Sequence, residues 1–328
     1  MITSVIKFPS QLVNREHDLK FQLDFRACFT QYYLPDMDES ADGTLSVYLT
    51  ALNHWETRTA NPPVGEITNE TLREFKQSFL KQGYSPETVK KYWRHIRAIL
   101  RRVGPVLDKN PLGEGIIERI PYMSPPKSTE RRKIPRIVTH EEINAIYQAC
   151  EVATWPYASS CPPPLLWRLA LVVFYNCAPR TQDFFKLTRK SINLETRRIS
   201  FTAQKTSKLQ GIPFQEIVSL HFESVYQFLS ANESTVIFPI TKCKRSLYDQ
   251  WKEIQNAAGI SLHVEFRDLR ETCNSLLNAA NPGALAGKWV LGHGGRDVNE
   301  IYYHNPSTEV LNAVEKLEQP DSFYSVLE

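Results

Sequence analysis

The stretch FRDLRETCNSLLNA, residues 266–279, is followed by LGH at 291–293 and by YYH at 302–304. Upstream lie APRTQD at 178–183 and KTSK at 205–208. In this order the motifs carry arginines, a lysine, a histidine and a tyrosine. A phenol can attack phosphorus, and fixed cationic donors stabilise the charge that then accumulates on the non-bridging oxygens of a phosphodiester. The set of motifs therefore suits phosphoryl transfer to a tyrosine.

The 266–279 stretch has the periodicity of an amphipathic helix. Leu269, Cys273, Leu276 and Leu277 recur at helical spacing, and Arg270 lies in the first turn. The N-terminus of a helix already favours anions, so an arginine there gains from a bound phosphate an interaction that it otherwise lacks. Arg270 is therefore a candidate phosphate ligand.

A nearly all-apolar run, residues 165–177, predicts a buried helix that delivers Arg180 at its end, after Pro179 breaks the pattern. A buried arginine needs a partner. An ion pair with Asp183 or another acid is the plain structural explanation. The functional explanation is a bidentate grip on a phosphate, a geometry that lysine does not supply. The residues alone are consistent with both.

Residues 198–202 and 211–214 alternate in polarity and flank a polar turn, which predicts a strand pair with Lys205 near its tip. A lysine on such a turn is ordinarily solvated surface. It serves as an acid for a leaving oxygen only if burial and neighbouring cations lower its pKa toward neutrality.

In these motifs the chain resembles the tyrosine recombinases, the family of phage integrases and Xer-type site-specific recombinases, over residues 43–318. The resemblance implies that Arg180 holds a non-bridging phosphate oxygen while Asp183 orients it. It implies that Lys205 protonates the leaving 5′ oxygen and that His293 contacts the scissile phosphate. It makes Tyr302 the nucleophile, whose attack leaves a 3′-phosphotyrosyl bond and frees a 5′-hydroxyl. Neither a cofactor nor a metal ion is expected.

Arg267 departs from the family's usual H-x-x-R motif, in which a histidine stands at this position. Histidine can take a proton near neutral pH, whereas arginine stays charged and only donates hydrogen bonds. Arg267 is therefore expected to stabilise the transition state and to be a poor general base. His263 is an alternative base if the helix begins earlier than expected. Tyr303 is an alternative nucleophile, although the spacing from His293 and the Y-x-H ending favour Tyr302.

Length and composition describe a soluble globular protein. The 328 residues exceed the size of one ordinary core, which predicts two domains. The net charge of +3 says little about nucleic acid, so the distribution of charge decides. No C-x-x-C pair occurs among the six cysteines, which favours reduced thiols over a disulfide framework or a zinc site. Without a signal-peptide layout or an apolar run of about 20 residues, a cytoplasmic protein with no membrane span is expected.

The expected fold class is mainly α with a small β-sheet. Thr68, Ser85-Pro86 and the capping box Thr139-x-x-Glu142 predict three helix starts. The predicted parts are an arm or short helix (1–42), an all-helical, SAM-like core-binding domain (43–120), a basic linker (121–136), a mixed α+β catalytic domain (137–306) and a C-terminal helix and tail (307–328). The resemblance implies that these parts close around duplex DNA as a C-shaped clamp.

Six cations on the helix that begins at Pro86, Arg102 among them, stand against a single nearby acid, Glu87. Solvated helix faces usually interleave acids at four-residue spacing. A surface that follows DNA phosphates is therefore favoured over a merely solvated face, and the linker adds further cations. The DNA-binding candidates are Lys90, Lys91, Arg94, Arg97, Arg101, Arg131, Arg132 and Lys133.

The sequence thus predicts a site-specific recombinase that acts on double-stranded DNA, as a dimer on one site and a tetramer in synapsis. A type IB topoisomerase, which has a similar set of active-site residues but relaxes supercoils without a partner duplex, is one alternative. The other, motivated by Arg267, is a DNA-binding relative that has lost cleavage. The helical pattern at 307–319 packs either on its own domain or, as is common in the family, on a neighbouring protomer.

Overall fold

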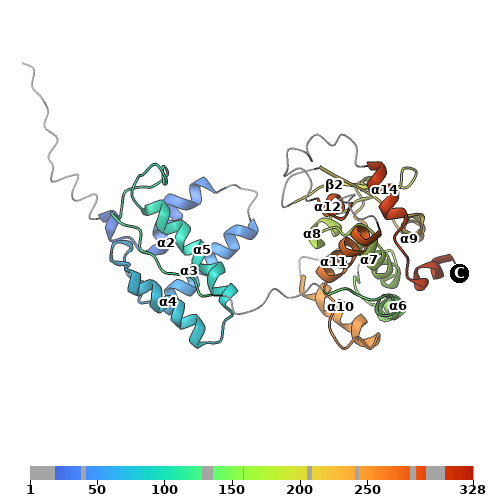
Figure 1. Cartoon of the computed structure of the whole chain (residues 1–328), viewed down its shortest axis with the longest axis horizontal. Coiled ribbons are helices and arrows are strands. Elements are labelled where there is room, and N and C mark those ends of the chain that lie inside the picture. Colours follow the sequence, from blue (N-terminus) through green and yellow to red (C-terminus); the bar gives the residue numbers. More distant parts are fainter. Residues whose placement is uncertain are drawn as a thin grey trace, which may run out of the picture. The chain divides into compact units, whose positions relative to one another are not determined.

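The computed structural model describes residues 19–37, 42–127, 136–157, 159–204, 209–240, 244–280, 286–292 and 307–327. The chain divides into two compact units, Met1–Lys133 and Ile134–Glu328. The described part of the first unit is helical, and the second combines helices with one small sheet (Figure 1). The predicted fold class, mainly α with a small β-sheet, is confirmed.

In its described residues the first unit contains three longer helices, α3 (Asp42–Arg58), α4 (Asn69–Lys81) and α5 (Pro86–Val103). Short turns precede and separate them: α2 (Phe25–Cys28), the π-helical turn η1 (Phe29–Tyr33), and the 3-10 turns η2 (Leu34–Asp36) and η3 (Val64–Glu66).

Local capping sets where α4 and α5 begin. The Thr68 side chain accepts a hydrogen bond from the Thr71 N–H, and the Ser85 side chain accepts one from the Thr88 N–H. Each bond satisfies an N–H that has no partner within the helix. Both predicted helix starts are therefore confirmed.

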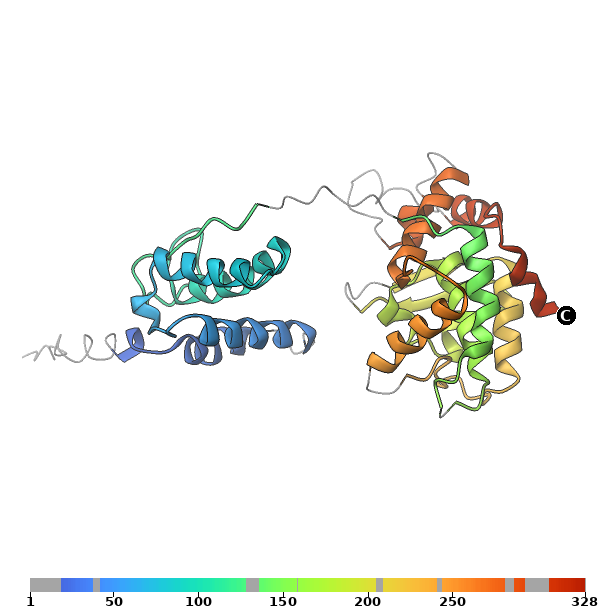
Figure 2. The same ribbon diagram turned by 90° about the horizontal axis from the view of Figure 1, so that it is seen from below.

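The core of the first unit lies between α3, α4, α5 and the segment before α3. The Trp55 ring, fully buried, lies 5.1 Å from the Phe25 ring and 5.3 Å from the Phe75 ring between centroids. In Figure 2 the blue N-terminal segment and α3 form one layer and the cyan-to-teal helices form another. Residues 25–29, which belong to the expected arm, thus supply part of this core rather than lying outside it.

The second unit is built around α7 (Pro163–Cys177), in which eleven of fifteen residues are buried. The other elements are α6 (His140–Ala149), η4 (Cys150–Val152), α8 (Thr181–Phe184), η5 (Arg189–Ser191), β1 (Ile192–Asn193), β2 (Arg198–Thr202), β3 (Leu209–Pro213), α9 (Glu216–Tyr226), α10 (Lys244–Ala257), α11 (Phe266–Ala280), α12 (Ala286–Val290), α14 (Ser307–Glu315) and η6 (Asp321–Leu327). The capping box of α6, formed by Thr139 and Glu142, is present as predicted.

An aromatic stack joins α7, α10 and α11. The Trp167 and Trp251 rings are stacked at 5.8 Å, and the Trp251 and Phe266 rings are stacked at 5.0 Å. Phe266 is the first residue of α11, so the stack fixes where that helix begins and which face it turns to the core. Arg270 lies one turn further along.

The three strands form an antiparallel sheet in the order β1-β2-β3. The predicted pairing of β2 with β3 is confirmed, with Ile199 opposite Ile212. Strand β1 was not predicted, because its two residues are too few for a strand periodicity to be visible.

The C-terminal segment packs on its own unit. Val310, Ala313 and Val314 of α14 are buried, and beyond α14 the Asn176 and Gln319 side-chain amides exchange hydrogen bonds of 3.0 and 2.9 Å. The ring of Phe323 is fully buried. Docking on a neighbouring protomer, the other arrangement considered, stays a prediction.

The end of the expected linker lies in the second unit. Arg136, the last residue of the expected linker, pairs with Glu142 and donates to the carbonyl oxygen of His263, so it belongs to the second unit.

The described cysteines, 28, 150, 161, 177 and 273, are free and buried, and Cys243 lies outside the described residues. Within the described ranges no helix has the length and apolar character that crossing a membrane requires.

Candidate active site

A sharp turn between α7 and α8 sets the position of Arg180. Ala178 ends α7 in the left-handed conformation, with φ of 45°. Arg180 then occupies the N-cap position of α8, and its carbonyl oxygen accepts hydrogen bonds of 2.9 Å from the N–H groups of Asp183 and Phe184. The turn brings the guanidinium and the carboxylate of Asp183 to the same side of the short helix.

The Asp183 carboxylate is buried, with 1% of its side chain exposed, and the Arg180 side chain is 22% exposed. Asp183 Oδ1 accepts a 3.0 Å hydrogen bond from the Gln204 N–H. The other oxygen, Oδ2, lies 3.8 Å from Arg180 Nη1, too far for a hydrogen bond. Both of these buried atoms lack a hydrogen-bond partner within the described part of the chain. The ion pair anticipated from the sequence exists, but it leaves Arg180 able to bind another oxygen.

Arg270 reaches the same turn from α11. Its Nη1 donates to the carbonyl oxygen of Ala178, and its Nη2 donates to that of Leu291 at 2.8 Å. Burial and the positive charge of Arg180 lower the pKa of Arg270 to about 10. Two guanidinium groups thus lie close together at this turn, and we refer to Arg180, Asp183 and Arg270 as the arginine corner.

The electrostatics of the arginine corner favour an anion. Removing a cation from water and placing it beside a second cation disfavours its charged form, as the lowered pKa of Arg270 shows. A phosphodiester carries negative charge on two non-bridging oxygens, and charge-assisted hydrogen bonds from arginine to such oxygens are strong. The corner is therefore suited to bind one phosphate.

Arg267 lies elsewhere on α11. Its side chain is 78% exposed, and its Nε lies 3.7 Å from Glu271 Oε1. Although Arg267 precedes Arg270 by a single helical turn, it does not join the arginine corner. His263 was an alternative base only if the helix began earlier than expected. The helix begins at Phe266, so His263 lies before it and this alternative does not hold.

Lys205, His293 and Tyr302 lie outside the described residues, as does the rival Tyr303. Gln204, directly before Lys205, and Leu291, two residues before His293, are described, and both contact the arginine corner. The Gln204 N–H contacts Asp183, and the Leu291 carbonyl contacts Arg270. Those contacts involve backbone atoms, for which the sequence carries no signal.

Gly292 of the LGH motif has a structural reason to be glycine. Its φ is 67°, in the left-handed region that other residues rarely adopt, and a Cβ there would meet the Gln210 side-chain amide at 1.4 Å. The turn before His293 therefore lies against strand β3, a contact that the motif alone does not reveal.

The cationic face of α5 is only partly as expected. Lys91, Arg94, Arg97 and Arg101 are exposed. In contrast, Lys90 pairs with Glu87 at 2.8 Å, and the sequence-based expectation that these cations lack acidic partners is wrong for it.

Arg102 also has acidic partners, contrary to the expectation: its Nη2 lies 2.8 Å from Asp36 and 2.9 Å from Glu114. These two acids are remote in sequence and were invisible to a helical-spacing argument. Arg131, Arg132 and Lys133 lie outside the described residues.

A family model described as the phage integrase family matches residues 136–309, more than half of the chain. Among solved structures, the chain is similar to a lambda integrase tetramer bound to a Holliday junction, with a TM-score of 0.63, 16% identity and coverage of 92% of this chain and 85% of that one. It is also similar to the Tn1549 transposon integrase in complex with transposon right end DNA, with a TM-score of 0.62, 14% identity and coverage of 89% and 98%. At these identities the similarity shows the fold. No curated protein matches the chain.

Proposed function

The chain belongs to the phage integrase family, the tyrosine recombinases, and from this premise we propose that it is a site-specific DNA recombinase. In this proposal it cuts one strand of each of two duplexes, rejoins them to form a Holliday junction, and then repeats the exchange on the other strands. Each cut passes through a 3′-phosphotyrosyl intermediate.

The proposed chemistry conserves bond energy in the protein-DNA linkage. The phenol of Tyr302 releases its proton to solvent and its oxygen attacks the scissile phosphorus; a bond from Tyr302 to phosphorus forms, and the bond from phosphorus to the 5′ oxygen breaks. Lys205 gives a proton to that leaving oxygen. The reverse attack by a 5′-hydroxyl on the phosphotyrosine reseals the strand, so no ATP is needed.

The observation that carries the proposal is the arginine corner. Arg270 comes from α11 and binds the carbonyl oxygen of Ala178, two residues before Arg180, and the carboxylate of Asp183 lies beside Arg180. Such a fixed pair of donors is suited to the charge that develops on the non-bridging oxygens, because it needs little reorganisation during the reaction. His293 and Arg267 complete the proposed set of donors. Arg267 is the least supported, because its side chain is largely exposed and near Glu271.

We further propose that the cations of α5, together with Arg131, Arg132 and Lys133, follow the backbone of double-stranded DNA. The matched lambda integrase structures contain a dimer bound to a core site and a tetramer bound to a Holliday junction. By analogy the chain is proposed to act as a dimer on a site and a tetramer in synapsis. DNA as the substrate makes the cytoplasm the proposed site of action.

A covalent-capture experiment on DNA of random sequence tests the assignment and finds the target in the same step. The full chain is incubated with a pool of nicked suicide duplexes of randomised sequence, and covalent complexes are isolated under denaturing conditions and sequenced. The expected result is a covalent adduct that enriches a common sequence and is lost in Tyr302→Phe. No adduct, or an adduct that persists in Tyr302→Phe, would contradict the active-site assignment.

The same material separates the alternatives. A type IB topoisomerase-like enzyme would relax supercoiled plasmids that lack the enriched sequence. A relative that has lost cleavage, the hypothesis motivated by Arg267, would bind DNA without forming any adduct. A recombinase exchanges strands between two duplexes that both carry the enriched sequence.

A further inference from the structure

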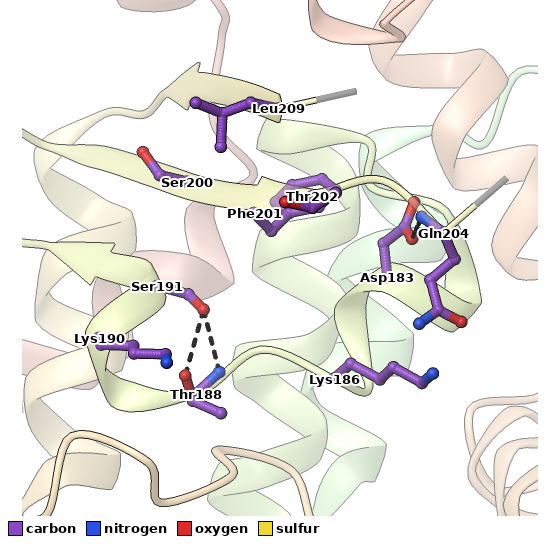
Figure 3. Close-up of a pocket in the computed structure, with 10 residues that line it drawn as sticks. All are labelled: Asp183, Lys186, Thr188, Lys190, Ser191, Ser200, Phe201, Thr202, Gln204 and Leu209. Atoms are coloured by element: carbon purple, nitrogen blue, oxygen red, sulfur yellow. Dashed lines mark hydrogen bonds between the residues drawn. The ribbon is translucent and has the colours of Figure 1, made fainter. Parts of the chain in front are cut away.

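A pocket of about 420 Å³ lies beside the arginine corner, at the edge of the sheet. Figure 3 shows it between strand β2 and the segment that runs from Lys186 to Ser191. Asp183 and Gln204 line one end of the pocket. The pocket therefore shares a wall with the arginine corner without containing either of its arginines.

The pocket exists because the sheet stops short on one side. Strand β1 pairs with Arg198 and Ile199 only, whereas β3 pairs with all five residues of β2. From Ser200 to Thr202 the edge of β2 that faces away from β3 therefore has no neighbouring strand among the described residues. The segment before β1 passes this open edge and supplies Lys186, Thr188, Lys190 and Ser191 to the lining.

The charged lining is cationic. Lys186 and Lys190 are both exposed, and no acidic side chain of the described residues forms an ion pair with either. Asp183 is the acid in the lining, and its oxygens already face the Gln204 N–H and Arg180. The nearby Arg189 is directed elsewhere, over the ring of Tyr226 at 4.3 Å. Two lysines thus lack a described counter-charge.

The remaining lining combines hydroxyl groups with apolar surface. Ser191 and Thr188 are joined at their side chains, while Ser200 and Thr202 come from β2. Phe201 and Leu209 supply the apolar part, and the Leu209 side chain is 79% exposed. A lining that combines two lysines with an exposed leucine suits a ligand with both an anionic and an apolar portion.

We propose that this pocket binds a deoxyribose-phosphate unit of the DNA backbone next to the one held at the arginine corner, with Lys186 and Lys190 on the phosphate and Leu209 on the sugar. The inference rests on the proposed function, which supplies the DNA. It adds a positioning site: a second anchored backbone unit restricts how the duplex can rotate about the phosphate at the arginine corner.

The test separates the ionic from the apolar contribution. Binding of a random-sequence duplex is followed by fluorescence anisotropy over a series of salt concentrations, with all variants made in the Tyr302→Phe chain so that no cleavage intervenes. The slope of log K against log salt is negative, and each phosphate contact that is lost reduces its magnitude by about 1. Below, a lower salt slope means a smaller magnitude. The double variant Lys186→Ala/Lys190→Ala is expected to lower the slope by about 1 to 2. Leu209→Ser is expected to weaken binding with the slope unchanged.

Lys252→Ala is the matched control, because Lys252 is an exposed lysine of the same unit on α10 and does not line the pocket. Circular dichroism melting curves confirm that the variants are folded. The inference is overturned if the double variant and Lys252→Ala have the same salt slope, or if Leu209→Ser binds like the parent chain. Covalent capture with Tyr302 intact reports separately on the proposed function. If the chain with Tyr302 forms an adduct while the double variant leaves the salt slope unchanged, the pocket inference alone is refuted. If the parent chain binds no duplex, both the inference and the proposed function are refuted.

Discussion

The arginine corner and the cationic face of α5 both gather positive charge, but they hold it differently. Arg270 is mostly buried, and two backbone carbonyl oxygens, those of Ala178 and Leu291, fix its guanidinium. Arg94 and Arg97 on α5 are exposed, and the contact of Arg97 is with the Tyr122 ring at 5.7 Å.

The difference indicates two uses of arginine. A buried, oriented guanidinium loses hydration and some proton affinity, and it has one geometry in which to meet an anion. An exposed guanidinium keeps its hydration and can follow any nearby phosphate, so its contribution is screened by salt. We therefore expect the arginine corner to govern the chemical step and the α5 face to govern affinity.

The largest expected effect is that of Arg270→Ala on covalent adduct formation. Loss of a fixed donor to a developing oxyanion lowers reaction rates by about 100- to 1,000-fold. Adduct formation on a suicide duplex measures the rate, and anisotropy measures binding. Arg267→Ala removes the exposed proposed donor one turn away on the same helix and is expected to lose less, because solvent screens that guanidinium. Equal losses in the two variants would break the distinction between the buried and the exposed arginine.

A smaller effect is expected from removing the exposed cations of α5. The triple variant Lys91→Ala/Arg94→Ala/Arg97→Ala should lower the salt slope of duplex binding by about 3, because each side chain accounts for one phosphate contact. The rate of adduct formation at saturating DNA should be unchanged. A rate loss that saturating DNA does not restore would show that α5 contributes to the chemical step.

Inorganic phosphate offers a test of the arginine corner without DNA. Phosphate at about ten times its Kd should stabilise the chain by about 1.4 kcal/mol, observed as a rise in Tm. The physical reason is that an anion restores the solvation that Arg270 loses on burial. The rise should disappear in Arg180→Ala and persist in Arg94→Ala. A rise that both variants retain would place the anion elsewhere.

The smallest expected effect concerns Lys90, which the structure pairs with Glu87. A partly exposed pair of this kind contributes about 0.3 to 0.5 kcal/mol to stability. Lys90→Ala should therefore change the free energy of unfolding by no more than this and should weaken duplex binding less than Lys91→Ala does. Urea unfolding and anisotropy give the two quantities. Equal binding losses would mean that Glu87 does not restrain Lys90.

Helix starts could be predicted from the sequence, whereas the roles of the candidate donors stay predictions. The caps at Thr68, Ser85 and Thr139 involve atoms within a few residues of one another, so the local pattern suffices. The short strand β1 and the packing of residues 25–29 could not be predicted. Strand β1 has two residues, so its pairing with Arg198 and Ile199 gives no visible strand periodicity, and Phe25 packs on Trp55, which is remote in sequence.

The amino-acid sequence alone determined the motifs, and through them the family and the helices that carry these motifs. What only the tertiary structure decided is the difference between Arg267 and Arg270, one turn apart on α11. The stacking of Phe266 on Trp251 turns one face of that helix to the core. Burial and the carbonyl oxygens of Ala178 and Leu291 then act on Arg270, while Arg267 stays in solvent. The physical reason is that solvation and orientation depend on three-dimensional neighbours, which a local sequence pattern does not specify.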